Sequence, residues 1–523
     1  MKIITARQMR ELDEKMTHEY GITALSLMEK AGAGVAELVL NLLRQNEWPR
    51  QVILFAGKGN NGGDAFVAAR ILEEHEVKTQ TLVLGSFDEI KGTARESFKK
   101  LQSRSPLILE VKTRDDLERV NSDLPKEAIL VDALLGTGSK GSLQGIFAET
   151  TEFINLKKFL SVIAIDLPSG LDPDRGCVRG IRVRADHTVT LGLPKQGLFL
   201  GEALEWVGVL HVVDLGIPEP LLNDLDPRES LLLPDDLTFP PKRKRLSHKG
   251  DFGHLLILGG SPGLTGAPTL ASLAALRSGA GLVTVGIPKS LNSIMEIKLT
   301  EPMTVPLPES ESGTLGLSAL DPILNFLKRA KAMVIGPGLS TQEETGVLIH
   351  RLLPQVSVPM VMDADALNIL AQNPSSLLKA KAPVILTPHP GEMARLTGKT
   401  ILEIQEDRWN IARQWAQETK SIVVLKGAGT VIASSEGNLD LNVTGNAAMA
   451  VGGMGDLLAG MIGGFLAQGM SSLEAAKLGV YLHGACGDEA VQQINCTQGL
   501  LASDLLPLIP RKLKEISAMA YEA

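Results

Sequence analysis

The chain alternates short apolar runs with longer amphipathic stretches, and the alternation occurs in two separate series. Most runs are far enough apart for a crossover helix, which is the pattern of a parallel sheet covered by helices. The runs of the first series lie at 51–57, 79–85, 128–134, 161–170, 187–194 and 209–216. Those of the second series lie at 254–260, 281–288, 332–338, 359–367, 383–389, 421–427 and 429–434. We therefore predict an α/β protein with two three-layer domains, the first of them a Rossmann-like doubly wound sheet.

The alternation breaks between about 220 and 245, where prolines and mixed charges gather. Such a segment is typical of a linker or an extended connection. A chain of 523 residues is also too long for one core of ordinary size. The predicted organisation is a first domain at 1–220, a linker at 221–244 and a second domain at 245–523.

Charge and cysteine content narrow the class of function. The formal net charge is −8, which gives no reason to bind nucleic acid or an anionic membrane. The basic cluster at 241–249 is most simply a solvated connection. Three cysteines without a C-x-x-C pair, and an amino terminus without an apolar secretory region, favour a reducing cytoplasm. The apolar stretch at 447–469 contains Asp456, which favours a buried helix over a membrane span.

A glycine loop, "GKGNNGGD" at 57–64, follows the first apolar run and matches the G-x-G-x-x-G dinucleotide pattern. Its context departs from that of a dehydrogenase cofactor loop. The next run ends in Gly85 and Ser86 without the acidic residue that would bind a ribose. Asp64 would also compete with a pyrophosphate at the helix start. A cofactor site and a purely structural turn stay open as alternatives at this point.

Two more loops at run ends carry polar residues, "VDALLGTGSKGS" at 131–142 and "IDLPSGLD" at 165–172. Because the carboxyl ends of parallel strands share one edge of a sheet, we expect Asp64, Asp132 and Asp166 to converge there. The alternatives are a strand-end cap for Asp132 and a local turn before Pro168 for Asp166.

The second half carries a glycine-rich helix start, "VTGNAAMAVGGMGDLLAGMIGGFLA" at 443–467. Free backbone N–H groups at such a start bind anions, and Asp456 could accept a proton from a substrate hydroxyl. A simple helix cap is the alternative for Asp456. Other chemistry-bearing residues follow strand ends: Lys426, His389, Glu392, Arg395, Asp363, Asp365, Gly336 and Gly338.

The motifs "GKGNNGGDAFVAAR", "VDALLGTG" and "IDLPSGLD" resemble the amino-terminal domain of the NAD(P)H-hydrate epimerases, over most of 1–220. The resemblance implies that the nucleotide is a substrate, a damaged NADH or NADPH that carries water across a nicotinamide-ring double bond. It implies a potassium ion held by Asn61, Asp132 and Ser169, and acid–base catalysis by Asp166. The implied substrate contacts are Asn60, Asn61, Gly62, Gly63, Asp64, Gly136, Thr137, Gly138, Ser139, Lys140, Gly141, Ser142 and Asp166.

The motifs "GPGL", "DADALN", "TPHPGEMARL", "KGAGT" and "GGMGDLLAG" resemble the ADP-dependent NAD(P)H-hydrate dehydratases of the ribokinase-like superfamily, over most of 245–510. The implied reaction phosphorylates the ring hydroxyl and then eliminates phosphate, so that NAD(P)H, AMP and phosphate result. Magnesium is expected with ADP, although no dedicated ligand set is visible. The implied substrate contacts are Ala280, Gly338, His389, Pro390, Gly391, Glu392, Met393, Ala394, Arg395 and the catalytic Asp456. The implied ADP contacts are Lys426, Gly427, Ala428, Gly429, Thr430, Asn446, Ala447, Ala448, Met449, Ala450, Val451, Gly452, Gly453, Met454 and Gly455.

Two residues depart from the dehydratase pattern. Met454 stands where the family has a threonine or serine, and Val451 replaces another hydroxyl residue. The backbone anion site does not depend on these side chains, but any hydroxyl contact to phosphate is lost. The departures bear on the rate and on the choice between ADP and ATP.

The sequence as a whole predicts a bifunctional repair enzyme, which interconverts the R and S forms of NAD(P)H hydrate and dehydrates the S form. We expect small-molecule partners only, and a homo-oligomer. One alternative is a ribokinase-like kinase for a vitamin or sugar, with a nucleotide-binding amino-terminal domain. Another is a non-catalytic binding module, which the retained Asn61, Asp132 and Asp166 argue against.

Overall fold

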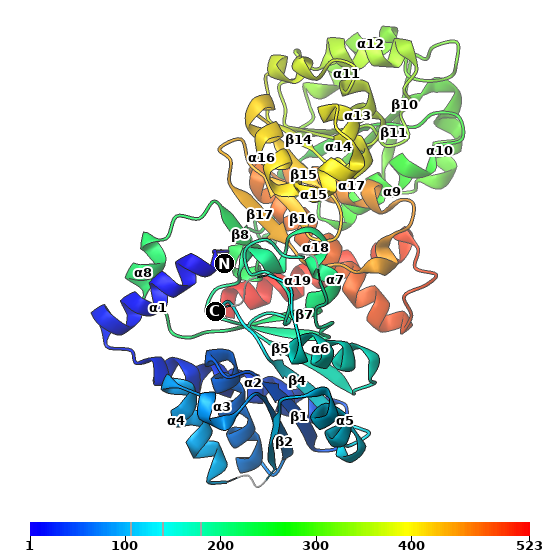
Figure 1. Cartoon of the computed structure of the whole chain (residues 1–523). Helices are drawn as coiled ribbons and strands as arrows, with labels where there is room; N and C mark the ends of the chain where they lie inside the picture. Colours follow the sequence, from blue (N-terminus) through cyan, green and yellow to red (C-terminus); the bar gives the residue numbers. More distant parts are fainter. Residues whose placement is uncertain (105–106, 139–140, 178–179, 523) are drawn as a thin grey trace. The chain divides into compact units, whose positions relative to one another are not determined.

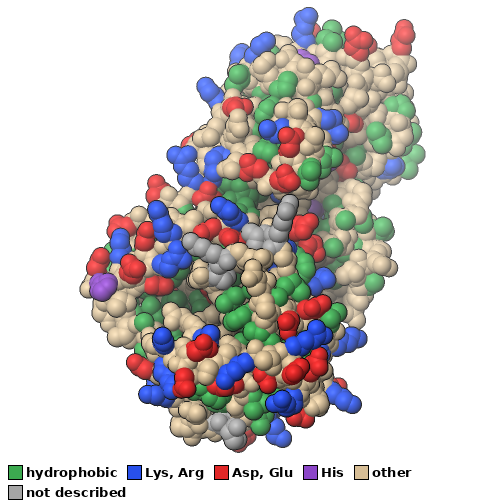
Figure 2. All heavy atoms as spheres, in the orientation of Figure 1, with side chains coloured by type: hydrophobic (Ala, Val, Ile, Leu, Met, Phe, Trp, Pro, Cys, Tyr) green, Lys and Arg blue, Asp and Glu red, His purple; other side chains and the backbone are tan. Residues whose placement is uncertain are grey.

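The computed structural model describes residues 1–104, 107–138, 141–177 and 180–522, which form two compact units (Figure 1). One unit is Lys2–Pro227, and the other runs from Arg228 to the end of the chain together with Met1. On the face shown in Figure 2, acidic and basic side chains are intermixed. Among the described residues, no helix is long and apolar enough to cross a membrane.

The amino-terminal unit is built on a seven-stranded, fully parallel sheet in the order β3-β2-β1-β4-β5-β6-β7. The strands are β1 (Gln51–Ala56), β2 (Lys78–Leu84), β3 (Ile108–Val111), β4 (Ile129–Ala133), β5 (Ser161–Ile165), β6 (His187–Leu191) and β7 (Val209–Val213). The predicted doubly wound sheet is confirmed. The edge strand β3 was not predicted, because it is short and half exposed and so lacks an apolar run.

Helices cover both faces of this sheet, as the alternation of side chains along β1 requires. Leu54 belongs to the core formed with α2, α3 and α4, whereas Ile53 and Phe55 belong to the core formed with α5 and α6. The helices of the unit are α1 (Ala6–Tyr20), α2 (Ala24–Gln45), α3 (Asn60–Glu74), α4 (Gly92–Gln102), α5 (Arg114–Asp123), α6 (Ile146–Leu156), α7 (Leu204–Val207) and α8 (Glu219–Asp224).

The carboxyl-terminal unit has a ten-stranded sheet in the order β11-β10-β9-β12-β13-β14-β15-β16-β17-β8. Its strands are β8 (Glu229–Leu231), β9 (His254–Leu258), β10 (Leu282–Pro288), β11 (Met303–Leu307), β12 (Ala332–Ile335), β13 (Met360–Met362), β14 (Val384–Leu386), β15 (Ile422–Leu425), β16 (Thr430–Ala433) and β17 (Leu439–Asn442). The pairs from β11 to β15 are parallel, and β16 runs antiparallel to both β15 and β17. The segment 221–244 contains β8, which pairs with β17 as the edge strand of this sheet.

This sheet is also covered on both faces. Leu255 and Ile257 of β9 join the core of α9, α17 and α18, while Leu256 and Leu258 are equally buried on the other side. The apolar stretch around Asp456 forms the buried helix α17, as predicted. The helices are α9 (Gly266–Arg277), α10 (Asn292–Lys298), α11 (Leu320–Leu327), α12 (Glu343–Leu352), α13 (Asp365–Leu370), α14 (Pro390–Thr397), α15 (Ile401–Glu406), α16 (Arg408–Thr419), α17 (Met454–Ala467), α18 (Ser472–Ile494) and α19 (Leu508–Glu522).

Candidate active sites

The strand order of the amino-terminal sheet reverses between β1 and β4, and the glycine loop lies at this point. Ligands of doubly wound proteins bind in the crevice at such a switch point. A Cβ on Gly57 would lie 2.1 Å from the Leu134 carbonyl oxygen, and one on Gly62 would lie 1.9 Å from the Gly57 carbonyl oxygen. The loops after β1 and β4 therefore approach one another at a distance that only glycine permits.

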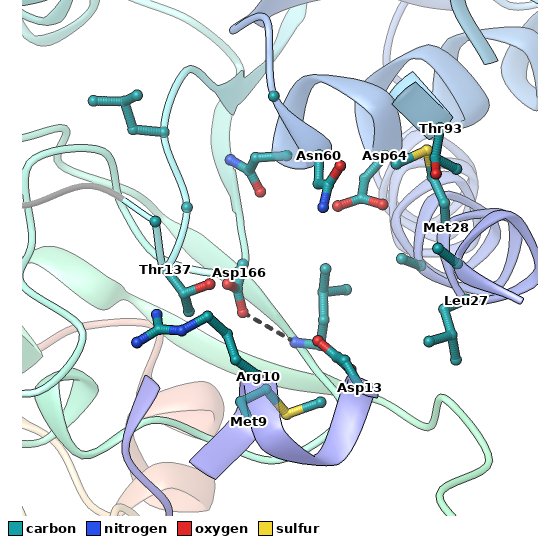
Figure 3. A pocket seen from close by; sticks show the side chains of 18 of the residues that line it. Met9, Arg10, Asp13, Leu27, Met28, Asn60, Asp64, Thr93, Thr137 and Asp166 are labelled. Atoms are coloured by element: carbon teal, nitrogen blue, oxygen red, sulfur yellow. Dashed lines mark hydrogen bonds between the residues drawn. The ribbon is translucent and has the colours of Figure 1, made fainter. Parts of the chain in front are cut away.

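A cavity of about 580 Å³ opens at this edge of the sheet (Figure 3). Of the residues that the sequence predicted, those that line it are Asn60, Asn61, Asp64, Gly136, Thr137, Gly138 and Asp166. Gly62 and Gly63 are buried in the first turn of α3 and are not among the lining residues. Gly141 and Ser142 do not line the cavity either, and Ser139 and Lys140 fall outside the described residues.

A buried ion pair sits at the centre of the cavity. Lys195 Nζ donates to Asp166 Oδ1 at 2.6 Å and to the Leu191 carbonyl oxygen at 2.8 Å, and its side chain is only 1% exposed. Asp166 has a φ of +65°, which costs a non-glycine residue backbone strain. Such strain is typical of residues that a site holds in place for function.

Two more carboxyl groups face this ion pair. Burial, with Asp166 and Asp13 adding, raises the pKa of Asp64 well above its ordinary value. Burial also raises the pKa of Asp13 to about 6, although Lys195 opposes the shift. The sequence did not predict Asp13 or Lys195. Lys195 could have been found, since it follows β6 at the same sheet edge as Asp132 and Asp166, whereas Asp13 lies on a helix whose polar face gives no signal.

The residues expected to hold a potassium ion lie beside the cavity. Ser169 donates to Asp132 twice, from Oγ to Oδ1 at 2.7 Å and from N to Oδ2 at 2.8 Å. The Leu135 N–H donates to Ser169 Oγ at 3.0 Å, and a Cβ on the adjacent Gly136 would lie 3.2 Å from Asn61 Oδ1. Burial raises the pKa of Asp132 to about 6 although the Ser169 hydrogen bonds lower it, and Asn61 Nδ2 is buried without a partner. The carboxylate, hydroxyl and amide oxygens fit a hard cation.

In the carboxyl-terminal unit, the start of α17 forms the second candidate site. Gly453 is its N-cap with a φ of +94°, and none of the described side chains caps the helix. The first-turn N–H groups therefore stay free for an anion, which the helix dipole also attracts. A Cβ on Gly455 would lie 3.2 Å from Lys426 Nζ and 3.7 Å from Asp363 Oδ2. The helix start thus faces a lysine and a carboxylate.

Three carboxyl groups, those of Asp363, Glu392 and Asp456, surround Lys426 at this helix start. Its Nζ donates to Asp363 Oδ1 at 2.8 Å and lies 3.9 Å from Glu392 Oε2. Burial raises the pKa of Asp456 to about 7, with Asp363 adding and Lys426 opposing. Burial likewise raises the pKa of Glu392 to about 7, although the positive charge of Lys426 lowers it. Among the described residues, no three His, Cys, Asp or Glu side chains are grouped closely enough to hold a metal ion.

The stretch from His389 to Arg395 works mainly as a capped helix. His389 Nδ1 accepts from Gly391 N at 3.0 Å, and burial lowers the pKa of His389, which favours this neutral role. Glu392 Oε2 accepts from His389 N at 2.7 Å, which completes the capping box of α14. Arg395 donates to Asn368 Oδ1 at 2.8 Å. The Met393 and Ala394 side chains are buried, so of this stretch Glu392 is the residue brought to Lys426.

Of the remaining predicted residues, most lie in loops that hydrogen bonds or close packing hold in place, and Ala280 lies away from the site. Arg408 donates to the carbonyl oxygens of Leu425 and Lys426 at 3.0 and 3.2 Å, and so braces the predicted ADP loop Lys426–Thr430. Gly338 packs against the Leu264 carbonyl. Ala280 precedes β10 beside Ala275, and the adjacent Gly279 faces Gln468 at the far end of α17 from Asp456. The structure therefore does not bring Ala280 to the helix start.

The loop 444–449, which contains the predicted ADP contacts from Asn446 to Met449, is held by hydrogen bonds to α18. Asp488 accepts from Gly445 N and from Asn446 Nδ2, both at 2.9 Å. Thr444 Oγ1 donates to the Tyr481 carbonyl oxygen at 3.0 Å, and Asn446 Oδ1 accepts from Ala448 N at 3.1 Å. The sequence did not predict Asp488 or Arg408, because both act on backbone far away in the sequence.

Two α/β units, each with carboxylates and one lysine at the carboxyl edge of its sheet, define an enzyme with two separate sites. Family models match both halves, "NAD(P)H-hydrate dehydratase" at 255–511 and "YjeF-related protein N-terminus" at 24–197. Bifunctional NAD(P)H-hydrate repair enzymes match almost the whole chain. The relative from Moorella thermoacetica is 42% identical over 517 residues, covering 99% of this chain and 97% of that protein. The relative from Escherichia coli is 34% identical over 511 residues, covering 97% and 93%.

A solved ADP/ATP-dependent NAD(P)H-hydrate dehydratase from Bacillus subtilis is 35% identical, covers 55% of this chain and 98% of that chain, and gives a TM-score of 0.48. From the near-full-length relatives, the chain belongs to the family of bifunctional NAD(P)H-hydrate repair enzymes. The predicted epimerase and dehydratase activities are confirmed at this level, in preference to the kinase and the non-catalytic module.

Proposed function

We propose that the cavity of the Lys2–Pro227 unit interconverts the hydrate epimers of NADH and NADPH, and that the helix start at Met454 dehydrates one epimer with ADP. The observation that carries the division is the anion site. In the carboxyl-terminal unit, Lys426 lies beside the first turn of α17, which no described side chain caps, and so can meet an anion there. The start of α3 is likewise uncapped, but Lys195 in that cavity is held by Asp166 and Leu191.

The epimerase reaction needs a proton donor and acceptor beside the ring. Hydration of an enamine double bond places the hydroxyl on the carbon next to the ring nitrogen. That hydroxyl leaves as water once it gains a proton, and water then adds to the opposite face. Asp166 exchanges this proton, and the Lys195 ammonium holds its carboxylate in place. Lys195 is a positioning residue in this scheme.

Asn61, Asp132 and Ser169 would hold a potassium ion beside the same cavity. When bound, the ion would supply positive charge for the nucleotide phosphates. The ion would also offset the charge of Asp132, whose pKa burial raises to about 6. The family shows the activity but not this ion, so its direct test is the dependence of the epimerase rate on K⁺ at constant ionic strength.

In the dehydratase site, Asp456 accepts the proton of the ring hydroxyl as that oxygen attacks the β-phosphorus of ADP, and the bond to AMP breaks. The free N–H groups from Gly452 to Gly455, together with Lys426, stabilise the charge on the transferred group. The bond between carbon and phosphate oxygen then breaks and the adjacent carbon loses a proton, so that the ring double bond returns. Magnesium would arrive on the ADP phosphates and offset their charge.

The test follows the recovery of 340 nm absorbance from an enzymatically prepared mixture of both hydrate epimers. We expect full recovery with ADP for the unchanged chain, and none for Asp456→Asn, which should still interconvert the epimers. Asp166→Asn should dehydrate one epimer quickly and leave the other to its spontaneous rate. The proposal fails if neither ADP nor ATP restores absorbance, or if Asp166→Asn consumes both epimers equally fast.

Three further properties stay predictions: the potassium requirement, a homo-oligomeric state and a cytoplasmic location. The second is measured by light scattering during size-exclusion chromatography.

A further inference from the structure

One wall of the epimerase cavity comes from α1, which lies outside the residues 24–197 that the family model matches. Arg10, Asp13 and Thr17 line the cavity from this helix. Their spacing of three and four residues puts them on one stripe of the helix, whereas Leu12 and Met16 are buried on its apolar side. The thioether of Met9 lines the cavity next to this stripe. The helix therefore presents a polar face to the substrate space.

Backbone pairing ties α1 to the segment that carries Lys195. Ile4 N donates to the Pro194 carbonyl oxygen and Gln196 N donates to the Ile4 carbonyl oxygen, both at 3.0 Å. At the start of the helix, Ala6 N donates to Asp174 Oδ1 at 2.6 Å, and Thr5 and Gln8 form a capping box. The position of Asp13 is thus fixed relative to Lys195 and, through Lys195, to Asp166.

Charge counting indicates that this cluster holds a proton at neutral pH. Three carboxyl groups, Asp13, Asp64 and Asp166, share one buried ammonium, Lys195. Like charges in a desolvated site cannot all ionise, and burial raises the pKa of Asp64 well above its ordinary value, so Asp64 keeps that proton. Burial raises the pKa of Asp13 to about 6, close enough to neutral pH for this carboxyl group to gain and lose a proton readily. The other cationic groups on the cavity wall are Arg10 and Lys58, and Lys58 is paired with Glu89 at 2.9 Å. In Figure 3 the Asp13 side chain points from α1 towards Asp166.

We propose that Asp13 is a second catalytic residue of the epimerase, which exchanges a proton with the ring hydroxyl from the cavity wall formed by α1 while Asp166 does so from the wall that follows β5. The inference rests on the proposed function of this cavity. Inversion at one carbon needs the hydroxyl to leave from one face and water to add to the other. A proton donor on one side and an acceptor on the other meet that need.

In one direction, the bond between the ring carbon and the hydroxyl oxygen breaks, and its electron pair stays on the oxygen, which takes a proton from Asp13. The lone pair of the ring nitrogen forms a C=N bond. Water then adds to the opposite face through its oxygen lone pair, the C=N π pair returns to nitrogen, and the surplus proton goes to Asp166. Proton exchange with solvent restores both groups, and the reverse direction exchanges their roles.

The test measures epimer interconversion by chromatography in the absence of ADP. Asp13→Asn should lower kcat by about 100-fold or more, which is the ordinary contribution of one acid–base group, and leave KM within threefold. Asp13→Glu keeps a carboxyl group and should retain clearly more kcat than Asp13→Asn. Glu14→Gln, an exposed charge change on the next residue of the same helix, should match the unchanged chain. Because the dehydratase site belongs to the other compact unit, the folding of each variant is checked by its circular dichroism spectrum and its Tm.

The inference is overturned if Asp13→Asn keeps kcat within twofold, or if its defect lies in KM alone. Equal losses in Asp13→Asn and Asp13→Glu would also overturn it, because they indicate a steric role. If the unchanged chain itself fails to interconvert the epimers, the proposed function fails first and the inference falls with it.

Discussion

Each unit of the chain surrounds one lysine with three carboxyl groups, but the two lysines differ in the hydrogen bonds left to them. Lys195 donates to Asp166 at 2.6 Å, to the Leu191 carbonyl at 2.8 Å and to Thr190 Oγ1 at 3.5 Å. An ammonium has three donors, so Lys195 has none for a ligand. Among the described residues, Lys426 donates one hydrogen bond, to Asp363 at 2.8 Å.

That difference separates proton chemistry from phosphoryl chemistry. Lys195, whose three N–H donors are all used, positions the Asp166 carboxylate and offsets its charge. Lys426 keeps donors that can bind phosphate oxygens beside the N–H groups of α17. Both clusters lie beside an uncapped helix start, so the difference between them is the number of hydrogen-bond donors that each lysine keeps for a ligand.

The largest expected effect comes from filling the space beside Lys426. Gly455→Ala puts a Cβ 3.2 Å from Lys426 Nζ and 3.7 Å from Asp363 Oδ2, so we expect the dehydratase kcat/KM to fall about 100-fold, the cost of one misplaced catalytic group. Gly346→Ala on α12, where a Cβ would lie 3.9 Å from Ile369 Cγ2, is the control for the same substitution outside the site. Equal losses in the two variants, measured by 340 nm recovery with ADP, would contradict the role given to Lys426.

A smaller effect concerns stability and pH. The pKa of Asp456 lies near 7 in the folded chain against an ordinary value near 4, so the folded state holds the extra proton between these pH values. The free energy of unfolding should therefore fall as pH rises from about 4 to 7. Asp456→Asn never ionises, so its Tm should exceed that of the unchanged chain by a few degrees at pH 8, and by least at pH 4.

Asp321→Asn is the control, because it removes the charge of an exposed aspartate at the start of α11. This variant should leave the pH dependence of Tm unchanged. Scanning calorimetry at both pH values makes the measurement. If Asp456→Asn is less stable than the unchanged chain at pH 8, the carboxylate is better paired than its surroundings indicate.

The smallest expected effect comes from restoring a hydroxyl. Met454→Thr returns the residue type of the family pattern at the first position of α17. Because the anion site uses backbone N–H groups, we expect the KM for ADP to change by less than about threefold, which corresponds to about 0.6 kcal/mol. A tenfold fall in KM would show that side chains contribute much of the phosphate binding, and would weaken the contrast between the two lysines.

The sequence predicted what local patterns encode and missed what tertiary contacts decide. Apolar runs predicted every strand of the first sheet except the edge strand β3, and the rule that parallel strand ends share an edge predicted that Asp64 and Asp166 meet. Ser169 beside Asp132 was implied by the family resemblance. Asp13 and Arg408 carry no such signal, because a polar residue on an amphipathic helix looks the same whether it meets solvent or a buried partner. Lys195 does follow β6 at the shared sheet edge, but its pairing with Asp166 depends on a tertiary contact that the sequence pattern does not show.

The fastening of the 444–449 loop to α18 has an entropic consequence. Asp488 already holds Gly445 and Asn446, and the Tyr481 carbonyl holds Thr444, so the loop is ordered by folding rather than by its ligand. When a nucleotide binds there, little binding free energy is lost to the entropic cost of ordering the loop backbone. Variants that release this loop should slow association and raise the heat released on binding, even where no atom that touches the nucleotide has changed.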